Sequence, residues 1–236
     1  IGLVDPGDID PQHVRRELDQ HELKCSAICA IMTADRDLRG NDQQQQTGVE
    51  YLETVMEQMQ VLACPKIVGP LYSAVGSTEA YEANEQQEQW KCVAGHLQKL
   101  AEKAEANQQT LCVEPLNRFE TDMVNTAEQG LEMLRQIDRP AMKLHLDTFH
   151  MNIEEKFLPE AIRRAGDQLG HLHACGSDRG TPGSDHTDWA GVAEALQAVN
   201  YNGDVVIESF TLDVKPIPRA AAIWRKIRPT RNEIAF

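Results

Sequence analysis

The sequence predicts an α/β fold of parallel strands, and it favours a closed (β/α)8 barrel over an open, doubly wound sheet. Short apolar runs alternate with amphipathic segments along the chain, which is typical of parallel strands joined by right-handed helical crossovers. No GxGxxG fingerprint follows the first run, which weakens the dinucleotide-binding form of the open sheet. Four of the runs also end in a metal-competent side chain, as expected at the mouth of a barrel.

Each element follows from local pattern. Buried strands are expected at the opening IGLV and at six later runs, SAICAIM (26–32), KIVGPL (66–71), TLCVEPL (110–116), MKLHLDT (142–148), LGHLHAC (169–175) and DVVIESF (204–210). Amphipathic helices are expected near 11–23, 45–63, 80–107, 126–137, 155–166 and 189–199. The polar tract at 40–48 is interpreted as a loop and helix start. Because no linker interrupts the alternation, residues 1–236 are predicted to form a single domain.

Composition narrows the class of partner. With 236 residues and 41% hydrophobic residues, the chain suits one domain with a full-sized core. Its formal net charge of -14 repels phosphate backbones and anionic membranes, so neither nucleic acid nor a membrane is an expected partner. A neutral small molecule such as a sugar is compatible with this charge, and so is a homo-oligomer. No apolar run approaches the roughly 20 residues that a membrane span needs.

The cysteines indicate a reducing compartment. Their spacing forms no CxxC pair and no disulfide framework, and most of the six fall inside apolar stretches. We therefore expect reduced core thiols in a cytoplasmic protein. The residues concerned are Cys25, Cys29, Cys64, Cys92, Cys112 and Cys175.

Four consecutive strands end in side chains that bind metals. Glu114 lies in CVEP, Asp147 in HLDT, His173 in HLHA and Glu208 in VIES. Any one of them could be a helix cap or a satisfied core group. Four on neighbouring strands are a different matter, because the carboxyl ends of parallel strands meet on one face and burying that much negative charge without a cation is costly. Three oxygens and one nitrogen suit Mn²⁺, Co²⁺ or Mg²⁺ better than a thiolate-preferring metal.

Several motifs resemble one known family. The segments EPLNRFETDMVNTAEQG (114–130), LDTFHMNIEE (146–155), GHLHACGSDRGTPGSDHTDW (170–189) and VVIESF (205–210) are similar to the D-tagatose and D-psicose 3-epimerase family of the xylose-isomerase-like barrel superfamily. The resemblance runs from about residue 1 to 227 and is densest between 110 and 210. It implies an isomerase that acts on a sugar and binds one divalent cation, most often Mn²⁺.

The resemblance also implies roles for individual residues. The metal ligands of the family fall on the four strand-end residues named above. Its substrate-binding residues fall on Glu120, His150 and Arg179, which would fix the O1 and O2 end of a ketose. The two glutamates among the ligands would exchange the C3 proton on opposite faces of the sugar through an enediolate, which inverts C3.

Where the sequence departs from the family, the substrate stays open. CGSDRG stands where characterised ketose epimerases carry a GESNR-like segment, and GSDHTDW also departs from their loop. An aldose–ketose isomerase, a hydroxypyruvate isomerase or an inosose dehydratase would use a similar site. A non-catalytic sugar-binding barrel is a weaker alternative. A zinc endonuclease of the superfamily is weaker still, since the chain lacks the extra strand-end histidines and the basic face.

Two further expectations concern the barrel interior and the chain ends. Strand alternation places Cys112, His145, His171 and Val206 one layer below the four metal-competent residues. The two histidines could orient the metal ligands by hydrogen bonds, or they could simply fill the barrel. Family members carry a strand and helix before the segment that matches Ile1, and a helix after the segment ending near Ile227. We therefore expect a barrel that is incomplete at both ends, with uncertain activity in this chain.

Overall fold

The fold is built on a single parallel sheet that curls across the molecule. The computed structural model describes residues 5–79, 82–210, 222–225 and 227. Within them the sheet has six strands in the order of the chain, β1-β2-β3-β4-β5-β6, and every neighbouring pair is parallel. The strands are β1 (Ile28–Cys29), β2 (Lys66–Gly69), β3 (Thr110–Val113), β4 (Met142–Asp147), β5 (Leu169–Ala174) and β6 (Val205–Ile207). All six later predicted strands are confirmed, while the opening IGLV lies outside the described residues.

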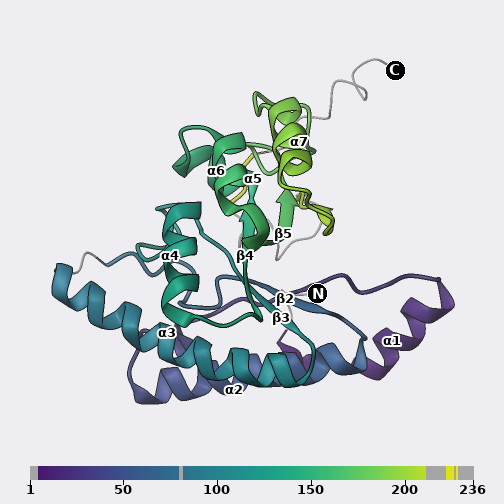
Figure 1. Cartoon of the computed structure of the whole chain (residues 1–236). Coiled ribbons are helices and arrows are strands. Elements are labelled where there is room, and N and C mark those ends of the chain that lie inside the picture. The colour runs from purple at the N-terminus through teal and green to yellow at the C-terminus, as the bar shows by residue number, and fades with distance from the viewer. Residues whose placement is uncertain (1–4, 80–81, 211–221, 226, 228–236) are drawn as a thin grey trace.

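Helices follow the strands around the outside of the sheet. Figure 1 shows α2 and α3 along the base, α4 at the side and α6 and α7 at the top, around the strands. The helices are α1 (Pro11–Gln20), α2 (Asp42–Val61), α3 (Ala83–Ala106), α4 (Ala127–Ile137), α5 (Thr148–Glu154), α6 (Leu158–Ala165) and α7 (Trp189–Ala198). Short 3-10 turns lie at Pro6–Asp8, Ala34–Arg36 and Gly166–Gln168. The regular succession of neighbouring parallel strands is the arrangement expected of a barrel wall, rather than the reversed strand order of a doubly wound sheet.

Local sequence accounts for where the helices begin. Asn41 and Gln44 form a capping box at the start of α2, which confirms the polar tract as a loop and helix start. Thr126 and Gln129 form the same device at α4. Helix α5 was not predicted, because the apolar run MKLHLDT extends the strand pattern to the residue at which this helix begins.

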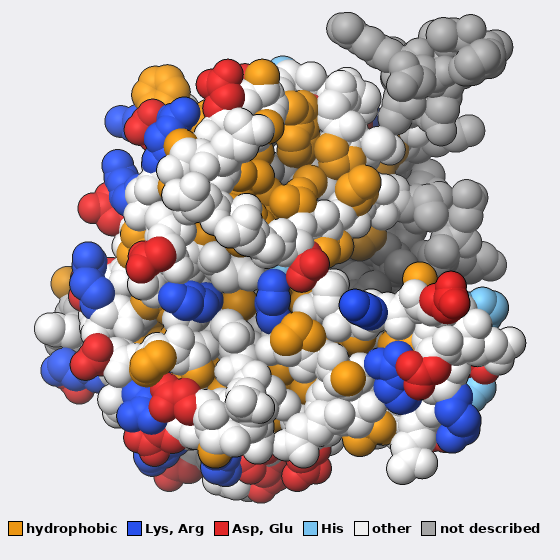
Figure 2. All heavy atoms as spheres, turned by 45° about the vertical axis from the view of Figure 1, so that its right-hand side comes forward, with side chains coloured by type: hydrophobic (Ala, Val, Ile, Leu, Met, Phe, Trp, Pro, Cys, Tyr) orange, Lys and Arg blue, Asp and Glu red, His pale blue; other side chains and the backbone are white. Residues whose placement is uncertain are grey.

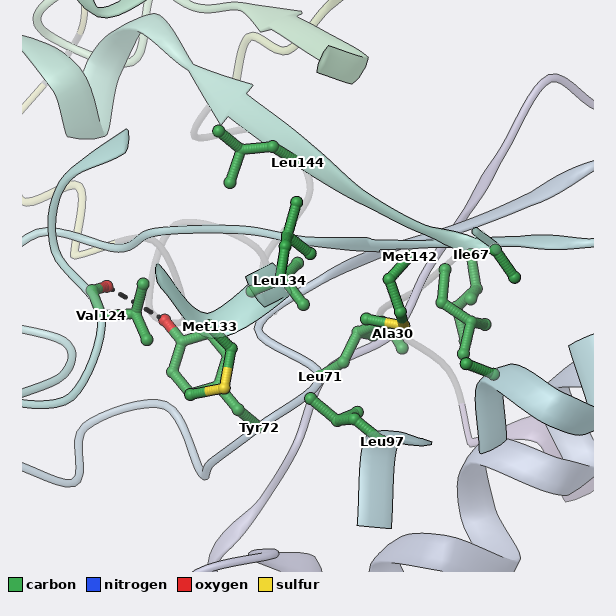
Figure 3. Packing of buried hydrophobic residues seen from close by; sticks show 14 of the residues in the cluster. Ala30, Ile67, Leu71, Tyr72, Leu97, Val124, Met133, Leu134, Met142 and Leu144 are labelled. Carbon is green, nitrogen blue, oxygen red and sulfur yellow. Dashed lines mark hydrogen bonds between the residues drawn. The ribbon is translucent and has the colours of Figure 1, made fainter. Parts of the chain in front are cut away.

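The core lies between the sheet and its helices. Figure 3 shows Leu71, Leu97 and Met142 packed together within this layer. Tyr72 is fully buried, and its hydroxyl donates toward the carbonyl oxygens of Glu114 at 2.9 Å and Val124 at 3.2 Å (Figure 3 draws the second contact). The core therefore fixes the backbone at the carboxyl end of β3, where the first predicted ligand lies.

The strands approach one another closely at the carboxyl end of β2. Gly69 has φ of +122°, and a Cβ at this position would lie 2.4 Å from the carbonyl oxygen of Ala30. Only glycine tolerates both the positive φ and this approach. Its own carbonyl accepts a hydrogen bond from the backbone N–H of Glu114 at 3.0 Å, so the turn also supports that residue.

The surface carries charges of both signs. On the face drawn in Figure 2, Lys and Arg side chains are interspersed with Asp and Glu, while hydrophobic side chains gather in the upper half. Within the described residues, none of the helices has the length and apolar character needed to cross a bilayer.

Candidate active site

The four predicted metal ligands come together at the carboxyl edge of the sheet. Glu114 and Glu208 directly follow β3 and β6, while Asp147 and His173 lie at the ends of β4 and β5. The carboxylate oxygens of Glu114 and Asp147 and a ring nitrogen of His173 lie within 4.8 Å of one another. His173 Nδ1 is also 3.4 Å from Glu208 Oε1 and 3.8 Å from Asp147 Oδ2. The strand ends thus aim three carboxylates and one imidazole at a shared region.

Because the cluster is largely buried, it is energetically costly for its carboxyl groups to be ionised together. Glu114, Asp147 and His173 are 5%, 1% and 6% exposed, and the Glu208 side chain is 23% exposed. The two oxygens of Asp147 have different partners. Oδ1 caps α5 by accepting a hydrogen bond from the backbone N–H of Phe149 at 2.6 Å, while Oδ2 faces the cluster. The cap function and the site function therefore coexist in one carboxylate.

Arg179 lies inside the acidic cluster. Its Nη1 is 2.6 Å from Glu208 Oε2 and 3.3 Å from Asp147 Oδ2, and its guanidinium stacks 3.8 Å above the ring of Phe149. The side chain is buried at 8% exposure, and its backbone has a positive φ of 65°. In this structure a cationic side chain therefore pairs with two of the predicted metal ligands.

The remaining predicted substrate residues line the same region. His150 Nδ1 accepts hydrogen bonds from the backbone N–H and the side-chain amide of Asn117, at 3.0 and 2.9 Å. Asn117 also donates to Glu120 Oε1 at 2.8 Å, and Arg179 lies 3.8 Å from the same oxygen. The structure thus brings Glu120, His150 and Arg179 together beside the ligand cluster.

The hydrogen bonds fix the protonation of His150. Burial and the nearby Arg179 charge lower the pKa of His150 to about 3, so the ring is neutral. Because Nδ1 accepts from Asn117, the single ring hydrogen is on Nε2. That Nε2 lies 3.2 Å from Arg179 Nη2, which is also a donor. The N–H groups of His150 and Arg179 therefore face each other, and this contact between two donors is unfavourable.

The pKa values of the cluster are pushed in opposite directions. Burial raises the pKa of Glu114 and raises that of Asp147 well above its ordinary value, and Glu208 adds to both shifts. Burial acts in the same sense on Glu208, but His173 and Arg179 outweigh it and lower the pKa of this carboxyl. Burial lowers the pKa of His173, yet the surrounding carboxylates reverse the effect and raise it. Neighbouring carboxyl groups whose pKa values are shifted in opposite directions are typical of sites for proton transfer.

Two further histidines lie under the cluster. The His145 ring is 4.2 Å from that of His173 and 5.0 Å from that of His171, between centroids. His145 Nδ1 is 3.4 Å from Glu114 Oε2. Both rings are fully buried, and within the described residues their four nitrogens make no hydrogen bond. Cys112 is fully buried as well, whereas Val206 is only partly buried.

The residues present fit a divalent cation. Three carboxylates converge here and Arg179 supplies one compensating charge, so ionising all three carboxylates would leave negative charge in excess unless a cation were bound. The buried Nδ1 of His173 makes no hydrogen bond within the described residues, although carboxylate oxygens lie near it. Oxygen and imidazole donors together suit a hard or borderline divalent ion.

Sequence analysis missed three residues that shape the site. Thr148 accepts from the backbone N–H of Cys175 at 2.8 Å and donates to its carbonyl at 2.7 Å. Asp185 accepts from the Ser177 backbone, the Thr187 hydroxyl and the Trp189 indole, at 2.6, 2.7 and 2.7 Å.

The third of these residues is Cys175, which was assigned to the core. It lies two residues after His173, and because alternate residues of a strand face the same side, this spacing was the signal that could have placed it in the site.

Comparison with known proteins identifies the family. The xylose isomerase-like TIM barrel family matches residues 3–228. The chain therefore belongs to this family, and the predicted barrel fold is confirmed.

Its relatives are sugar epimerases. The chain is 36% identical over 233 residues to a probable ketose 3-epimerase of Synechocystis sp., a match that covers 96% of this chain and 78% of that protein. It is 34% identical over 208 residues to D-psicose 3-epimerase of Ruminiclostridium cellulolyticum, covering 88% and 69% of the two chains. The crystal structure of a D-allulose 3-epimerase from Methylomonas sp. superposes with a TM-score of 0.90 at 29% identity, covering 100% of this chain and 82% of that one. The prediction that the protein is an enzyme of the isomerase class is thereby confirmed.

Proposed function

We propose that this chain catalyses the C3 epimerisation of a ketose with the help of one divalent cation. The observation that supports the proposal is the convergence of Glu114, Asp147, His173 and Glu208 on one buried region at the barrel mouth. Membership of a family whose similar members are ketose 3-epimerases supports the substrate class.

These four side chains are the proposed cation ligands, with Mn²⁺ as the preferred ion and Co²⁺ or Mg²⁺ as substitutes. When bound, the cation supplies Lewis acidity, which polarises the ketose carbonyl and acidifies the proton on C3. Arg179 now pairs with two of these carboxylates. Because two donor groups of Arg179 and His150 already oppose each other, we expect the guanidinium to move when the cation binds.

The proton transfer itself is assigned to the two glutamates. Glu114 and Glu208 come from strands β3 and β6, with β4 and β5 between them, so they approach the site from different sides. One removes the C3 proton to give an enediolate, and the other returns a proton to the opposite face. Two bases on two faces are what inversion at carbon requires.

Glu120, His150 and Arg179 are proposed to hold the O1 and O2 end of the sugar. His150 presents a neutral N–H, because its Nδ1 is occupied by Asn117. Glu120 is held by the same asparagine, so the two side chains are positioned as a unit. The His150 N–H is a donor, the Glu120 carboxylate is an acceptor and the Arg179 guanidinium is a cation. Together these three groups can bind the oxygen atoms at that end of a ketose.

The buried histidines are proposed as positioning residues. His145 lies 3.4 Å from Glu114 Oε2 and can orient this carboxylate, while His171 contacts the other two imidazoles. We expect the larger effect on the cation site from His145.

Other reactions on the same site remain as alternatives. An aldose–ketose or hydroxypyruvate isomerase, or an inosose dehydratase, would use the same acid–base pair. A sugar-binding barrel without catalysis would need neither of two glutamate bases, which disfavours it.

The test is proton exchange with solvent. Chelator-treated protein is reloaded with Mn²⁺ and incubated with fructose, tagatose or hydroxypyruvate in deuterated water. We expect deuterium at C3 of a ketose, with formation of its C3 epimer and loss of both after chelation. Label at another carbon would assign an isomerase instead, and tight sugar and metal binding without any exchange would contradict an enzymatic role.

A further inference from the structure

One buried thiol lies against the carboxylates of the cation site. Cys175 directly follows β5 and is two residues beyond His173. It is fully buried, and Thr148 holds its peptide from both sides through the two hydrogen bonds described above. The position of this backbone is therefore set by β4 and α5, which also set Asp147.

A cationic atom already contacts this thiol together with two carboxylates. Arg179 Nη1 is 3.9 Å from Cys175 Sγ, 3.3 Å from Asp147 Oδ2 and 2.6 Å from Glu208 Oε2. One donor atom from each of Asp147, Cys175 and Glu208 lies within 4.8 Å of the others. A positive charge placed at one point is thus shared by a sulfur and two oxygens.

We propose that Cys175 is an additional ligand of this cation site, and that Asp147, Cys175 and Glu208 together hold thiophilic divalent ions. The inference rests on the proposed cation-dependent function, and it adds a sulfur donor to a set that otherwise contains oxygen and nitrogen. Thiolates select Zn²⁺, Cd²⁺ and Co²⁺ over Mn²⁺ and Mg²⁺. When the metal–sulfur bond forms, the thiol proton passes to solvent.

The alternative is a thiol that only fills space, and Cys112 provides the comparison. Cys112 is equally buried in β3, but its sulfur lies beside Gly170 and it belongs to none of the described clusters that could hold a metal. Cys175 differs from it in facing two carboxylates that are also proposed metal ligands. The pair therefore allows a matched experiment in the same chain.

The experiment is a spectroscopic titration with Co²⁺ and Cd²⁺, in parallel with Mn²⁺ binding. We expect the unmodified chain to give a near-ultraviolet thiolate-to-metal absorption band that saturates with one ion per chain. Cys175→Ser should lose the band and reduce the affinity for Cd²⁺ relative to Mn²⁺ by about tenfold or more. Cys112→Ser should keep both properties. Cys175→Ala provides a second variant, and retained Mn²⁺ affinity shows that a variant is folded.

The outcomes separate the two proposals. Binding of Mn²⁺ and Co²⁺ without a thiolate band overturns the role of Cys175 and leaves the proposed function intact. A band that persists in Cys175→Ala but disappears in Cys112→Ser also overturns it. Failure of every cation to bind overturns the proposed cation-dependent function, and the role of Cys175 with it.

Discussion

Arg179 and Glu208 form a close ion pair, with Nη1 of the guanidinium 2.6 Å from Oε2 of the carboxylate. Glu208 is both a proposed metal ligand and a proposed base, so the arginine competes directly with a bound cation for the same oxygen. This competition leads to the first of four predictions.

Arg179→Gln should strengthen cation binding while it weakens catalysis. A unit charge about 4 Å from a cation costs about 4 kcal/mol at an effective dielectric constant of about 20, so its removal should raise Mn²⁺ affinity by at least about tenfold. The KM for the ketose should rise because a substrate contact is lost. Calorimetric titration and steady-state kinetics measure the two effects. Arg118→Gln is the control, since that exposed arginine pairs with Glu154 away from the cluster. Unchanged or weaker Mn²⁺ binding in Arg179→Gln would contradict the competition.

Glu114→Gln and Glu208→Gln should each slow epimerisation strongly but leave exchange on one face of the sugar. Loss of one base is expected to lower the epimerisation rate by about 10²–10⁴-fold. The remaining glutamate should still exchange the C3 proton of one epimer with solvent, and the two variants should select opposite epimers. Nuclear magnetic resonance of each C3-deuterated epimer measures this, at Mn²⁺ concentrations shown to saturate each variant. If both variants exchange the same epimer, the two-base assignment is wrong.

His145→Leu should weaken the cation site without destabilising the fold. The ring nitrogens of His145 make no hydrogen bond within the described residues, so leucine removes buried polar atoms, which is neutral or favourable for the free energy of unfolding. Loss of its contact with Glu114 should lower Mn²⁺ affinity by about tenfold to a hundredfold.

His171→Leu is the matched variant for that experiment, since this ring lies 5.0 Å from each of the other two imidazoles, between centroids. Its effect on Mn²⁺ affinity should be smaller than that of His145→Leu. Urea denaturation and Mn²⁺ titration of both variants provide the readout. Unchanged metal affinity in both would show that the histidines merely fill the barrel.

Asp185→Asn should loosen the loop that carries Arg179. Burial tends to raise the pKa of Asp185, but its hydrogen bonds from Ser177, Thr187 and Trp189 outweigh burial and lower the pKa. A carboxyl with a lowered folded-state pKa stabilises the protein above its ordinary pKa, and this stability is lost as the pH falls through the folded-state value. The variant should therefore lose about 1 to 2 kcal/mol of unfolding free energy at pH 7.

The pH profile provides the check on this prediction. Denaturation measured from pH 7 down to pH 3 should show the difference between Asp185→Asn and the unmodified chain shrinking as the acid limit is approached. Asp188→Asn is the control, because asparagine can still cap α7 as Asp188 does. A difference that does not change with pH would rule out the charge of Asp185 as its cause.

The sequence alone was sufficient for much of the fold, and it predicted that the four residues proposed as ligands would lie at one edge of the sheet. Apolar runs bounded by polar segments located the six later strands, and the polar tract at 40–48 indicated the start of a helix. A parallel sheet brings all its carboxyl ends to one edge, so the proximity of Glu114, Asp147, His173 and Glu208 could be predicted without coordinates. Their exact roles stay a proposal.

Only the tertiary structure decided what surrounds those ligands. Arg179 pairing with Glu208, Thr148 holding Cys175, and Asn117 fixing the tautomer of His150 all join residues from different strand–helix units. Such contacts leave no periodic trace in the chain, because they depend on loop paths and side-chain directions that strand alternation does not specify. Helix α5 was missed for a related reason, since its start overlaps the apolar run of β4 and only the cap by Asp147 ends the strand there. Local pattern thus determines which elements form, whereas packing between the units determines which side chains share the site.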